Sequence, residues 1–339
     1  MADITILGCG FGTALAVLWH NAGHKITAYS KFPEEIKAIK KDREHKKLLP
    51  GVPIPEEIEF TSDISKTRNS DIVVFAIPSK FMREVAEEAA PHIPENAVIV
   101  NVSKGFSENK HTPCRLSEVI QAAIPCNPVV VLTGPCHAEE VARGVPTALT
   151  CASPCKESAE YIQSTLQNSR FRIYASEDII GCELGGALKN PIALCCGIAS
   201  GMGLGDNTAA ALMTRGLAEI KRLGTALHAR WQTFTGLAGV GDLIVTCTSK
   251  HSRNNRAGIL IGQGVPAEEA IRQIGTVEGY DCVKIALELA KQNNVNLPIF
   301  EQLYKICYEG LSPREALQAL MERPQREERE DYWCFCECD

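Results

Sequence analysis

The amino-terminal segment constrains the fold of this chain more than any other stretch. Ile4–Leu7 is a short apolar run that stops at a glycine-rich turn, Gly8–Gly12 (GCGFG). Thr13–His20 then has the composition of an apolar helix, and Lys25–Tyr29 that of a second strand. Strand, glycine turn, helix and strand in this order indicate the βαβ unit that opens a dinucleotide-binding fold, although a glycine-rich strand end alone is the simpler interpretation. In such a unit the glycines let the backbone approach a pyrophosphate at the helix N-terminus.

The following residues alternate short apolar runs with helix-like stretches. The predicted strands are Ile58–Thr61, Ile72–Ile77, Val98–Val102, Val129–Thr133, Thr147–Cys151 and Phe171–Tyr174. The predicted helices between them are Lys80–Ala90, Cys114–Ala123 and Cys155–Gln167. This alternation predicts a mostly parallel sheet covered on both faces. We therefore predict an α/β Rossmann-like domain over residues 1–180.

After Ser176 the strand pattern stops and helices dominate to about Leu320. We predict an all-α domain over residues 181–322, with a helix capped by Asp206 or Asn207 and ended by Gly224. Residues 323–339 follow as a tail that we expect to be disordered. Its three alternate cysteines could instead bind a soft metal, but they lack a second ligand cluster; these are Cys334, Cys336 and Cys338.

The composition is that of a soluble globular protein, with 45% hydrophobic and 22% charged residues. The net charge of −6 gives no global basic field for nucleic acid. We find no signal peptide and no apolar run of the ~18 residues that a membrane-spanning helix needs, so we expect a cytoplasmic protein. The fifteen cysteines are scattered through predicted helices and strands, so we interpret most as small buried hydrophobes and expect no metal site.

Three predicted strands end in loops that carry ligand-type chemistry, at Val74–Lys80, Asn101–Gly105 and Thr133–Ala138. Ligands of open α/β sheets bind beyond the carboxyl ends of the strands, so these loops should converge. Lys104 lies just past one strand. An exposed loop lysine is the alternative, but this position favours a functional role.

Lys189 lies among small residues in the segment Cys182–Thr214. Helical neighbours three and four positions away are Gly185, Gly186, Ile192 and Ala193. An ammonium on such a face is either desolvated, which suits acid/base chemistry, or reaches solvent from a helix end. Both readings stay open on this stretch alone.

A second dense patch is Gly236–Gly258, which contains Asp242 and the run Ser252–Asn254 (SRN). Arginine beside serine and asparagine donors suits a phosphate or carboxylate. Glu278 follows within Thr276–Tyr280.

Four motifs in this order, GGALKN, GDN, GVGDLIVTCTSKHSRN and VEGY, resemble those of bacterial-type NAD(P)-dependent glycerol-3-phosphate dehydrogenases. The resemblance runs from the glycine turn to about residue 322. It implies a Rossmann domain, a helical domain, and the interconversion of dihydroxyacetone phosphate and sn-glycerol 3-phosphate with NAD(P)H for phospholipid synthesis. The expected partner is thus this small-molecule substrate, with no nucleic acid or membrane, and a homodimer is the working hypothesis for assembly.

The resemblance also implies roles for individual residues. Lys189 matches the catalytic lysine, which would stabilise the developing oxyanion and protonate it, while Asp242 orients its ammonium. The expected substrate-binding residues are Lys104, Gly134, Cys136, Asn190, Ser252, Arg253 and Asn254. The expected cofactor-binding residues are Gly8, Gly10, Phe11, Gly12, Ser30, Lys31, Lys104, Ala138, Arg253 and Glu278.

Three departures from the family pattern stand out. The glycine turn is one residue short, Pro191 directly follows Asn190, and Cys136 replaces a serine or threonine. Proline disfavours helical geometry at the residue before it, which affects the expected contact of Asn190. Two alternatives stay open: a β-hydroxyacid or ketopantoate-type reductase, which has no need of the SRN cluster, and a non-catalytic NAD(P)-sensing protein.

The end of the second strand bears on the choice of cofactor. NAD-specific domains place a carboxylate about 20 residues after the first glycine, where it accepts from the ribose 2′-hydroxyl. Here that count reaches Ser30 and Lys31, with no acid at the strand end, while Glu34 and Glu35 follow Pro33 and begin the next helix. Ser30 and Lys31 could bind a 2′-phosphate, so the sequence predicts that NADPH is accepted at least as well as NADH. A solvent-facing Lys31 is the alternative.

Overall fold

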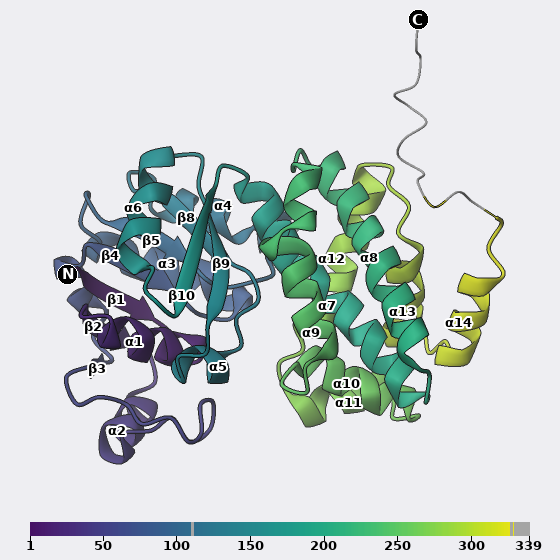
Figure 1. Ribbon diagram of the computed structural model, residues 1–339, viewed down its shortest axis with the longest axis horizontal. Helices are drawn as coiled ribbons and strands as arrows, with labels where there is room; N and C mark the ends of the chain where they lie inside the picture. The colour runs from purple at the N-terminus through teal and green to yellow at the C-terminus, as the bar shows by residue number, and fades with distance from the viewer. Residues whose placement is uncertain (110–111, 326–327, 329–339) are drawn as a thin grey trace, which may run out of the picture.

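The computed structural model describes residues 1–109, 112–325 and 328. These residues form a sheet domain and a helical domain that lie side by side (Figure 1). The architecture confirms the predicted Rossmann-like domain followed by an all-α domain. Cys334, Cys336 and Cys338 of the predicted tail lie outside the described residues.

The sheet domain is built on an eight-stranded sheet in the order β10-β9-β8-β5-β4-β1-β2-β3. All neighbouring strands run parallel except β8 and β9, which pair antiparallel. The strands of this sheet are β1 (Asp3–Leu7), β2 (Lys25–Tyr29), β3 (Glu59–Thr61), β4 (Ile72–Phe75), β5 (Val98–Asn101), β8 (Val129–Thr133), β9 (Thr147–Ala152) and β10 (Phe171–Ser176). Every predicted strand is therefore present.

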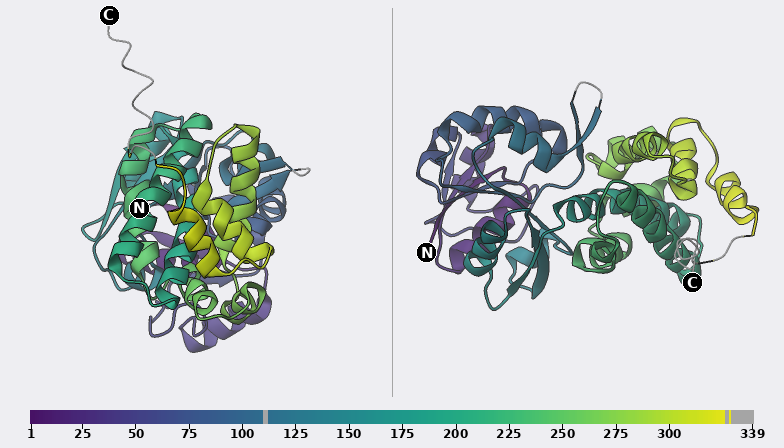
Figure 2. Two further views of the ribbon diagram at one scale, coloured as in Figure 1. Left: turned by 90° about the vertical axis from the view of Figure 1, so that its right-hand side faces the viewer. Right: turned by 90° about the horizontal axis from the view of Figure 1, so that it is seen from above.

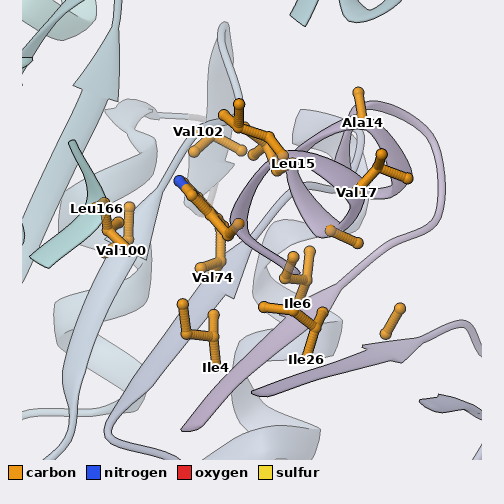
Figure 3. Close-up of a cluster of buried hydrophobic side chains, with 14 of the residues drawn as sticks. Ile4, Ile6, Ala14, Leu15, Val17, Ile26, Val74, Val100, Val102 and Leu166 are labelled. Atoms are coloured by element: carbon orange, nitrogen blue, oxygen red, sulfur yellow. The ribbon is translucent and has the colours of Figure 1, made fainter. Parts of the chain in front are cut away.

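Helices cover both faces of this sheet because its central strands are apolar on both sides, as IVVF in β4 illustrates. One face packs on α1 and α6 and the other on α3 and α4. Figure 3 shows part of the first layer, with Ile4 and Ile6 of β1 near Leu15 and Val17 of α1. The helices of this domain are α1 (Phe11–Asn21), α2 (Pro33–Asp42), α3 (Met82–Ala89), α4 (Leu116–Ala123), α5 (Ala138–Ala142) and α6 (Lys156–Leu166).

Two elements of the sheet domain were not expected. A hairpin of β6 (Phe106–Asn109) and β7 (Thr112–Arg115) projects from the domain (Figure 2, right), and it takes residues 114 and 115 from the predicted helix Cys114–Ala123. Helix α4 begins only at Leu116, where Glu118 accepts from the Arg115 backbone N–H. The short helix α5 was also missed, because five residues show too little periodicity to be recognised.

The helical domain is organised around α7 (Ile179–Gly201), which lies centrally in it (Figure 1). The others are α8 (Asp206–Ala226), α9 (Asp242–Thr248), α10 (Arg253–Gly262), α11 (Ala267–Ile274), α12 (Glu278–Gln292), α13 (Pro298–Tyr308) and α14 (Pro313–Met321). Two predictions about α8 were wrong: its N-cap is Gly205, and it runs past Gly224 to Ala226.

Glycines bring α7 and α10 into close backbone contact. A Cβ on Gly197 would lie 2.1 Å from the Asn255 carbonyl oxygen, and one on Gly258 would lie 2.2 Å from that of Leu194. Side chains at these positions would force the helices apart. The small residues of Cys182–Thr214 therefore allow α7 and α10 to pack closely, in addition to forming the helix face beside Lys189.

Helix α7 also corrects the prediction that no stretch is long and apolar enough to cross a membrane. This helix has 23 residues, and an 18-residue window of it passes that test by length and composition, with a mean hydropathy of 1.2. However, 89% of that window is buried inside the protein. The apolar surface of α7 faces neighbouring helices, so this is the core helix of the domain.

Candidate functional site

The three loops predicted to converge meet at the carboxyl ends of β4, β5 and β8. Ser103 after β5 donates its hydroxyl to the Ile77 carbonyl oxygen at 2.6 Å and accepts from the Ile77 N–H at 3.0 Å. Lys104 Nζ donates to the Gly134 carbonyl oxygen at 3.0 Å. These contacts tie the ends of neighbouring parallel strands together, which is where an open α/β sheet binds its ligand.

Helix α7 packs closely on its neighbours at the site because two of its residues have no side chain, and Gly186 is the one that faces the loops. A Cβ on Gly186 would lie 3.0 Å from Thr133 Oγ1 and 3.5 Å from Lys104 Cγ, and one on Gly185 would lie 2.3 Å from the Ala238 carbonyl oxygen. A side chain on Gly186 would push α7 away from the sheet domain, and one on Gly185 would push it away from the Ala238 backbone of its own domain. The small face beside Lys189 thus brings the two domains together at the site.

Lys189 and Lys104 share the carboxylate of Asp242. Lys189 Nζ donates to Asp242 Oδ1, and Lys104 Nζ donates to Asp242 Oδ2 at 2.6 Å. The Asp242 side chain is only 1% exposed, and those of Lys189 and Lys104 are 7% and 17% exposed. The reading of Lys189 as a helix-end lysine in solvent is therefore wrong; it is buried and paired.

Burial and charge act differently on the two lysines. Burial lowers the pKa of Lys189 below its ordinary value, and the nearby Lys104 charge adds to this, while Asp242 opposes it. Burial also has the largest single effect on Lys104 and acts to lower its pKa, but the charge of Asp242, together with Cys136 and the hydrogen bond to Asp242, outweighs burial and the pKa is raised. Lys104 is therefore the fixed cation of the pair, and Lys189 is the group that can give up a proton.

The hydrogen bonds of the two ammonium groups support the same division. Lys189 Nζ donates to Asp242 and to Thr246 Oγ1 at 2.6 Å, so the described residues engage two of its three protons. Lys104 Nζ donates to Gly134 and Asp242 and lies 3.6 Å from Cys136 Sγ, which uses all three directions. The remaining proton of Lys189 is available to a ligand.

Thr246 was missed by the sequence reasoning. Its hydroxyl accepts from Lys189 and donates to the Asp242 carbonyl oxygen at 2.6 Å, one turn earlier on α9. The spacing between Asp242 and Thr246 is i, i+4, which puts both on one face of a helix. That spacing was the available signal.

Two more polar atoms at the site escaped the sequence reasoning. Thr133 Oγ1 and His137 Nε2 are buried and have no hydrogen-bond partner among the described residues. Thr133 ends β8, and His137 precedes α5, beside the expected Cys136 and Ala138. Buried polar atoms are normally satisfied, so both are candidates to contact a ligand. Burial raises the pKa of the Cys136 thiol, which is therefore a neutral group here.

Asn190, Asn254 and Glu278 form one hydrogen-bonded chain. Asn254 Nδ2 donates to Asn190 Oδ1 at 3.0 Å, and Asn190 Nδ2 donates to Glu278 Oε2 at 2.9 Å. Asn254 Oδ1 also accepts from the Gly279 N–H at 2.8 Å. Burial raises the pKa of Glu278, with nearby Arg253 acting against it. The sequence predicted these residues as separate ligand contacts, whereas the structure joins them to one another.

Pro191 does not disturb Asn190, because α7 continues through the proline. Proline lacks the N–H that would bond to the carbonyl four residues earlier, which is that of Ala187. The Ala187 carbonyl oxygen accepts instead from Cys282 Sγ at 3.4 Å. A thiol on α12 thus compensates the bond that Pro191 removes.

The remaining residues of the SRN run begin α10. Ser252 is the N-cap, and its side chain accepts from the Asn255 N–H at 3.2 Å. Arg253, the first residue of the helix, is exposed. Ser252 therefore has a structural role, and Arg253 is the exposed cation that this run offers.

The glycine turn has the shape that a dinucleotide pyrophosphate requires. Gly8 has φ +110°, and a Cβ there would lie 2.4 Å from the Ala76 carbonyl oxygen, so only glycine fits. A Cβ on Gly12 would lie 2.8 Å from Ile6 Cγ2, which allows α1 to pack tightly on β1. A Cβ on Gly10, the N-cap of α1, would make only an ordinary contact, 3.8 Å from Leu48 Cδ1. Phe11 begins α1 and packs against the sheet core. The short turn therefore still leads from the end of β1 directly into the N-terminus of α1, where an anion can bind.

At the end of β2 the structure contradicts the expected absence of an acid. Ser30 Oγ donates to Glu35 Oε2 at 2.5 Å, and Lys31 Nζ pairs with Glu84 Oε1 at 2.6 Å. Glu34 and Glu35 do begin α2, as expected, but the Glu35 side chain turns back onto the strand end. Sequence alone could not show this, because it depends on the path from β2 into α2.

Comparison with known proteins gives the family of this chain. The family model described as NAD-dependent glycerol-3-phosphate dehydrogenase N-terminus matches residues 3–159, and that of the C-terminus matches residues 178–318. This chain belongs to the NAD-dependent glycerol-3-phosphate dehydrogenase family. Glycerol-3-phosphate dehydrogenase (NAD(P)+) of Desulfitobacterium hafniense (strain Y51) is 45% identical over 333 residues, covering 98% of this chain and 94% of its own. That of Thermoanaerobacter sp. (strain X514) is 48% identical over 328 residues, covering 96% and 98%.

Solved structures give the same family. Glycerol-3-phosphate dehydrogenase from Coxiella burnetii is 35% identical with a TM-score of 0.90, covering 95% of this chain and 99% of its own. A ketopantoate reductase from Ralstonia eutropha reaches a TM-score of 0.58 at 13% identity, which shows a shared fold alone. Within the described parts of the chain, no group of three His, Cys, Asp or Glu residues could hold a metal ion.

Proposed function

We propose that this protein reduces dihydroxyacetone phosphate to sn-glycerol 3-phosphate reversibly with NAD(P)H and so supplies glycerophospholipid synthesis. The observation that carries the proposal is the Lys189–Asp242–Lys104 arrangement at the strand ends, in which a buried lysine keeps one proton for a ligand. The relatives named above carry the corresponding activity in their names. A merely cofactor-sensing protein would have no use for such a proton donor.

The chemistry assigned to these residues follows from their charges. The nicotinamide, when bound, supplies a hydride to the ketone carbon, so negative charge develops on the carbonyl oxygen. Lys189 hydrogen-bonds this oxygen and transfers a proton to it, and its lowered pKa favours that transfer. Asp242 and Thr246 fix the direction of the ammonium, while Lys104 stays charged and stabilises the oxyanion.

The substrate phosphate is assigned to Arg253, the exposed guanidinium at the start of α10. A guanidinium binds phosphate in a bidentate manner, and backbone N–H groups at a helix start add to this. Asn190, Asn254 and Glu278 position the start of α10 against α7 and α12 through their hydrogen-bonded chain. Thr133 Oγ1 and His137 Nε2 are assigned to the substrate hydroxyl or a bound water.

The remaining assignments are part of the same proposal. We place the boundary between the cofactor domain and the substrate domain near residue 180, supported by the start of α7 at Ile179. We also place the protein in the cytoplasm and retain a homodimer as the working hypothesis for its assembly, which light scattering would measure.

The test is to mix the purified protein with NADH or NADPH and dihydroxyacetone phosphate and follow nicotinamide absorbance. We expect oxidation that depends on the phosphorylated ketone and is absent with ketopantoate. Cofactor binding without turnover of dihydroxyacetone phosphate would instead indicate the sensing protein, and turnover of ketopantoate would indicate the other reductase.

A further inference from the structure

The carboxylate of Glu35 is held at the carboxyl end of β2 by hydrogen bonds to both of its oxygens. Oε2 accepts from Ser30 Oγ at 2.5 Å, and Oε1 lies 3.2 Å from His45 Nε2. His45 Nδ1 accepts from the Leu48 N–H at 3.4 Å, which assigns the ring proton to Nε2 and makes His45 the donor to Glu35. The Glu35 side chain is 27% exposed, so its free edge still faces outward.

The supports of Glu35 are rigid. His45 is buried, and its ring is fixed between Glu35 and the Leu48 backbone. Ser30 is also buried, and its hydroxyl accepts from the Phe32 N–H at 3.3 Å while it donates to Glu35. The hydrogen bond from His45 and that from Ser30 hold the pKa of Glu35 below its usual range against the effect of burial. Glu35 is therefore a fixed anion at neutral pH.

This anion lies beside the glycine turn. Leu7 and Tyr29 are paired at the ends of β1 and β2, and the Gly8 N–H donates to the Tyr29 carbonyl oxygen at 2.8 Å. Cys9 Sγ inside the turn also donates to the Tyr29 carbonyl oxygen at 3.7 Å, and the next residue along the chain is Ser30, which holds Glu35. A dinucleotide with its pyrophosphate on the turn has its adenosine ribose at this point.

The groups that could have bound a 2′-phosphate are already paired with acids. The Ser30 proton is donated to Glu35, and Lys31 is paired with Glu84 at the surface. Exposed ion pairs are weak, so Lys31 can be released from Glu84 at little cost. Glu35 has no such freedom, because His45 and Ser30 fix both of its oxygens.

We propose that Glu35 accepts a hydrogen bond from the 2′-hydroxyl of the adenosine ribose and thereby makes NADH the preferred cofactor over NADPH. The inference rests on the proposed function, because it concerns the cofactor of that reaction. NADPH is still bound, with Lys31 as the counter-ion of its 2′-phosphate. It binds more weakly than NADH because the fixed carboxylate of Glu35 repels that phosphate. His45 acts as a positioning residue for Glu35.

Direct binding tests this without turnover. Calorimetric dissociation constants for NADH and NADPH are measured for the wild type, Glu35→Gln and Glu34→Gln. Glu34→Gln is the matched control, because it removes the same charge from the same helical turn at an exposed position. The pair ADP and 2′,5′-ADP, titrated into the wild type, isolates the ribose site and needs no variant to fold.

We expect the wild type to bind NADH ~10-fold or more tightly than NADPH, and ADP more tightly than 2′,5′-ADP. Glu35→Gln should bring the ratio of the dissociation constants for NADPH and NADH close to one, while Glu34→Gln should leave that ratio as it is in the wild type. A wild type that binds NADPH as tightly as NADH, or equal ratios in the two variants, overturns the inference. Failure of both cofactors to bind would count against the proposed function instead, whereas binding of both cofactors without the expected preference counts against Glu35 alone.

Discussion

Replacing Asp242 by Asn removes the negative charge that two buried ammonium groups share. The amide keeps the size of the carboxylate, but its NH₂ group then faces one of the two lysine nitrogens, so that donor meets donor. Removing one partner of a buried ion pair costs about 3–5 kcal/mol. Because the pKa of Lys189 is already lowered, Lys189 can release its proton and relieve the repulsion. We therefore expect a stability loss near the lower figure, about 3 kcal/mol.

The same change should alter catalysis in a way that depends on pH. Without Asp242 the pKa of Lys189 falls further, and a neutral amine cannot protonate the developing oxyanion. We expect kcat for dihydroxyacetone phosphate reduction to fall ~10²-fold or more at neutral pH. A base-form Lys189 regains its proton as the pH falls, so the alkaline limb of the kcat profile should move to lower pH in the variant.

The assays are kcat against pH and urea unfolding, with Asp42→Asn as the control. Asp42 also pairs with a lysine, Lys46 at 2.7 Å, but at the surface, where solvent screens the pair and its contribution to stability is small. The control should thus resemble the wild type in both assays. An Asp242→Asn enzyme with kcat within ~10-fold of wild type and an unmoved alkaline limb would refute the role given to this carboxylate.

Two further predictions follow from other parts of the molecule. For Arg253→Ala we expect a large rise in KM for the phosphorylated substrate, from the loss of roughly 2–5 kcal/mol, and a much smaller effect with dihydroxyacetone; equal effects on both would make Arg253 structural. Burial raises the pKa of Glu219 to about 7 from 4.5, so its contribution to stability is present below pH 4.5 and is lost as the pH rises to about 7. Glu219→Gln should therefore match the wild type in urea unfolding at pH 4.5 and exceed its stability at pH 8; a lower stability at pH 8 would contradict this.

The strands and the site loops could be predicted because their signals are local. Buried runs such as Ile72–Phe75 and the glycine turn after β1 are visible in the sequence itself, and strand ends of a parallel sheet must converge. The hairpin Phe106–Arg115 could not be predicted in this way, because its short strands lack a clear period.

Side-chain pairing at the site was predictable only in part. The resemblance brought Lys189 and Asp242 together, but nothing in the sequence shows that Asp242 also binds Lys104, which is 138 positions away. The turn of Glu35 back onto Ser30 depends on the start of α2 and on His45, which lies ten residues further on. Contacts of this kind follow from tertiary structure and have no period in the sequence.

The central claim is that Lys189 donates the proton in the reduction. It is tested most directly by measuring kcat and the dissociation constant for NADH in Lys189→Met, whose unbranched side chain is one atom shorter and carries no charge. We predict that kcat falls by ~10²-fold or more, with NADH binding within about twofold of wild type, because Lys189 acts on the substrate oxygen and not on the cofactor. A variant that retains most of its turnover, or that loses NADH binding together with kcat, would contradict it.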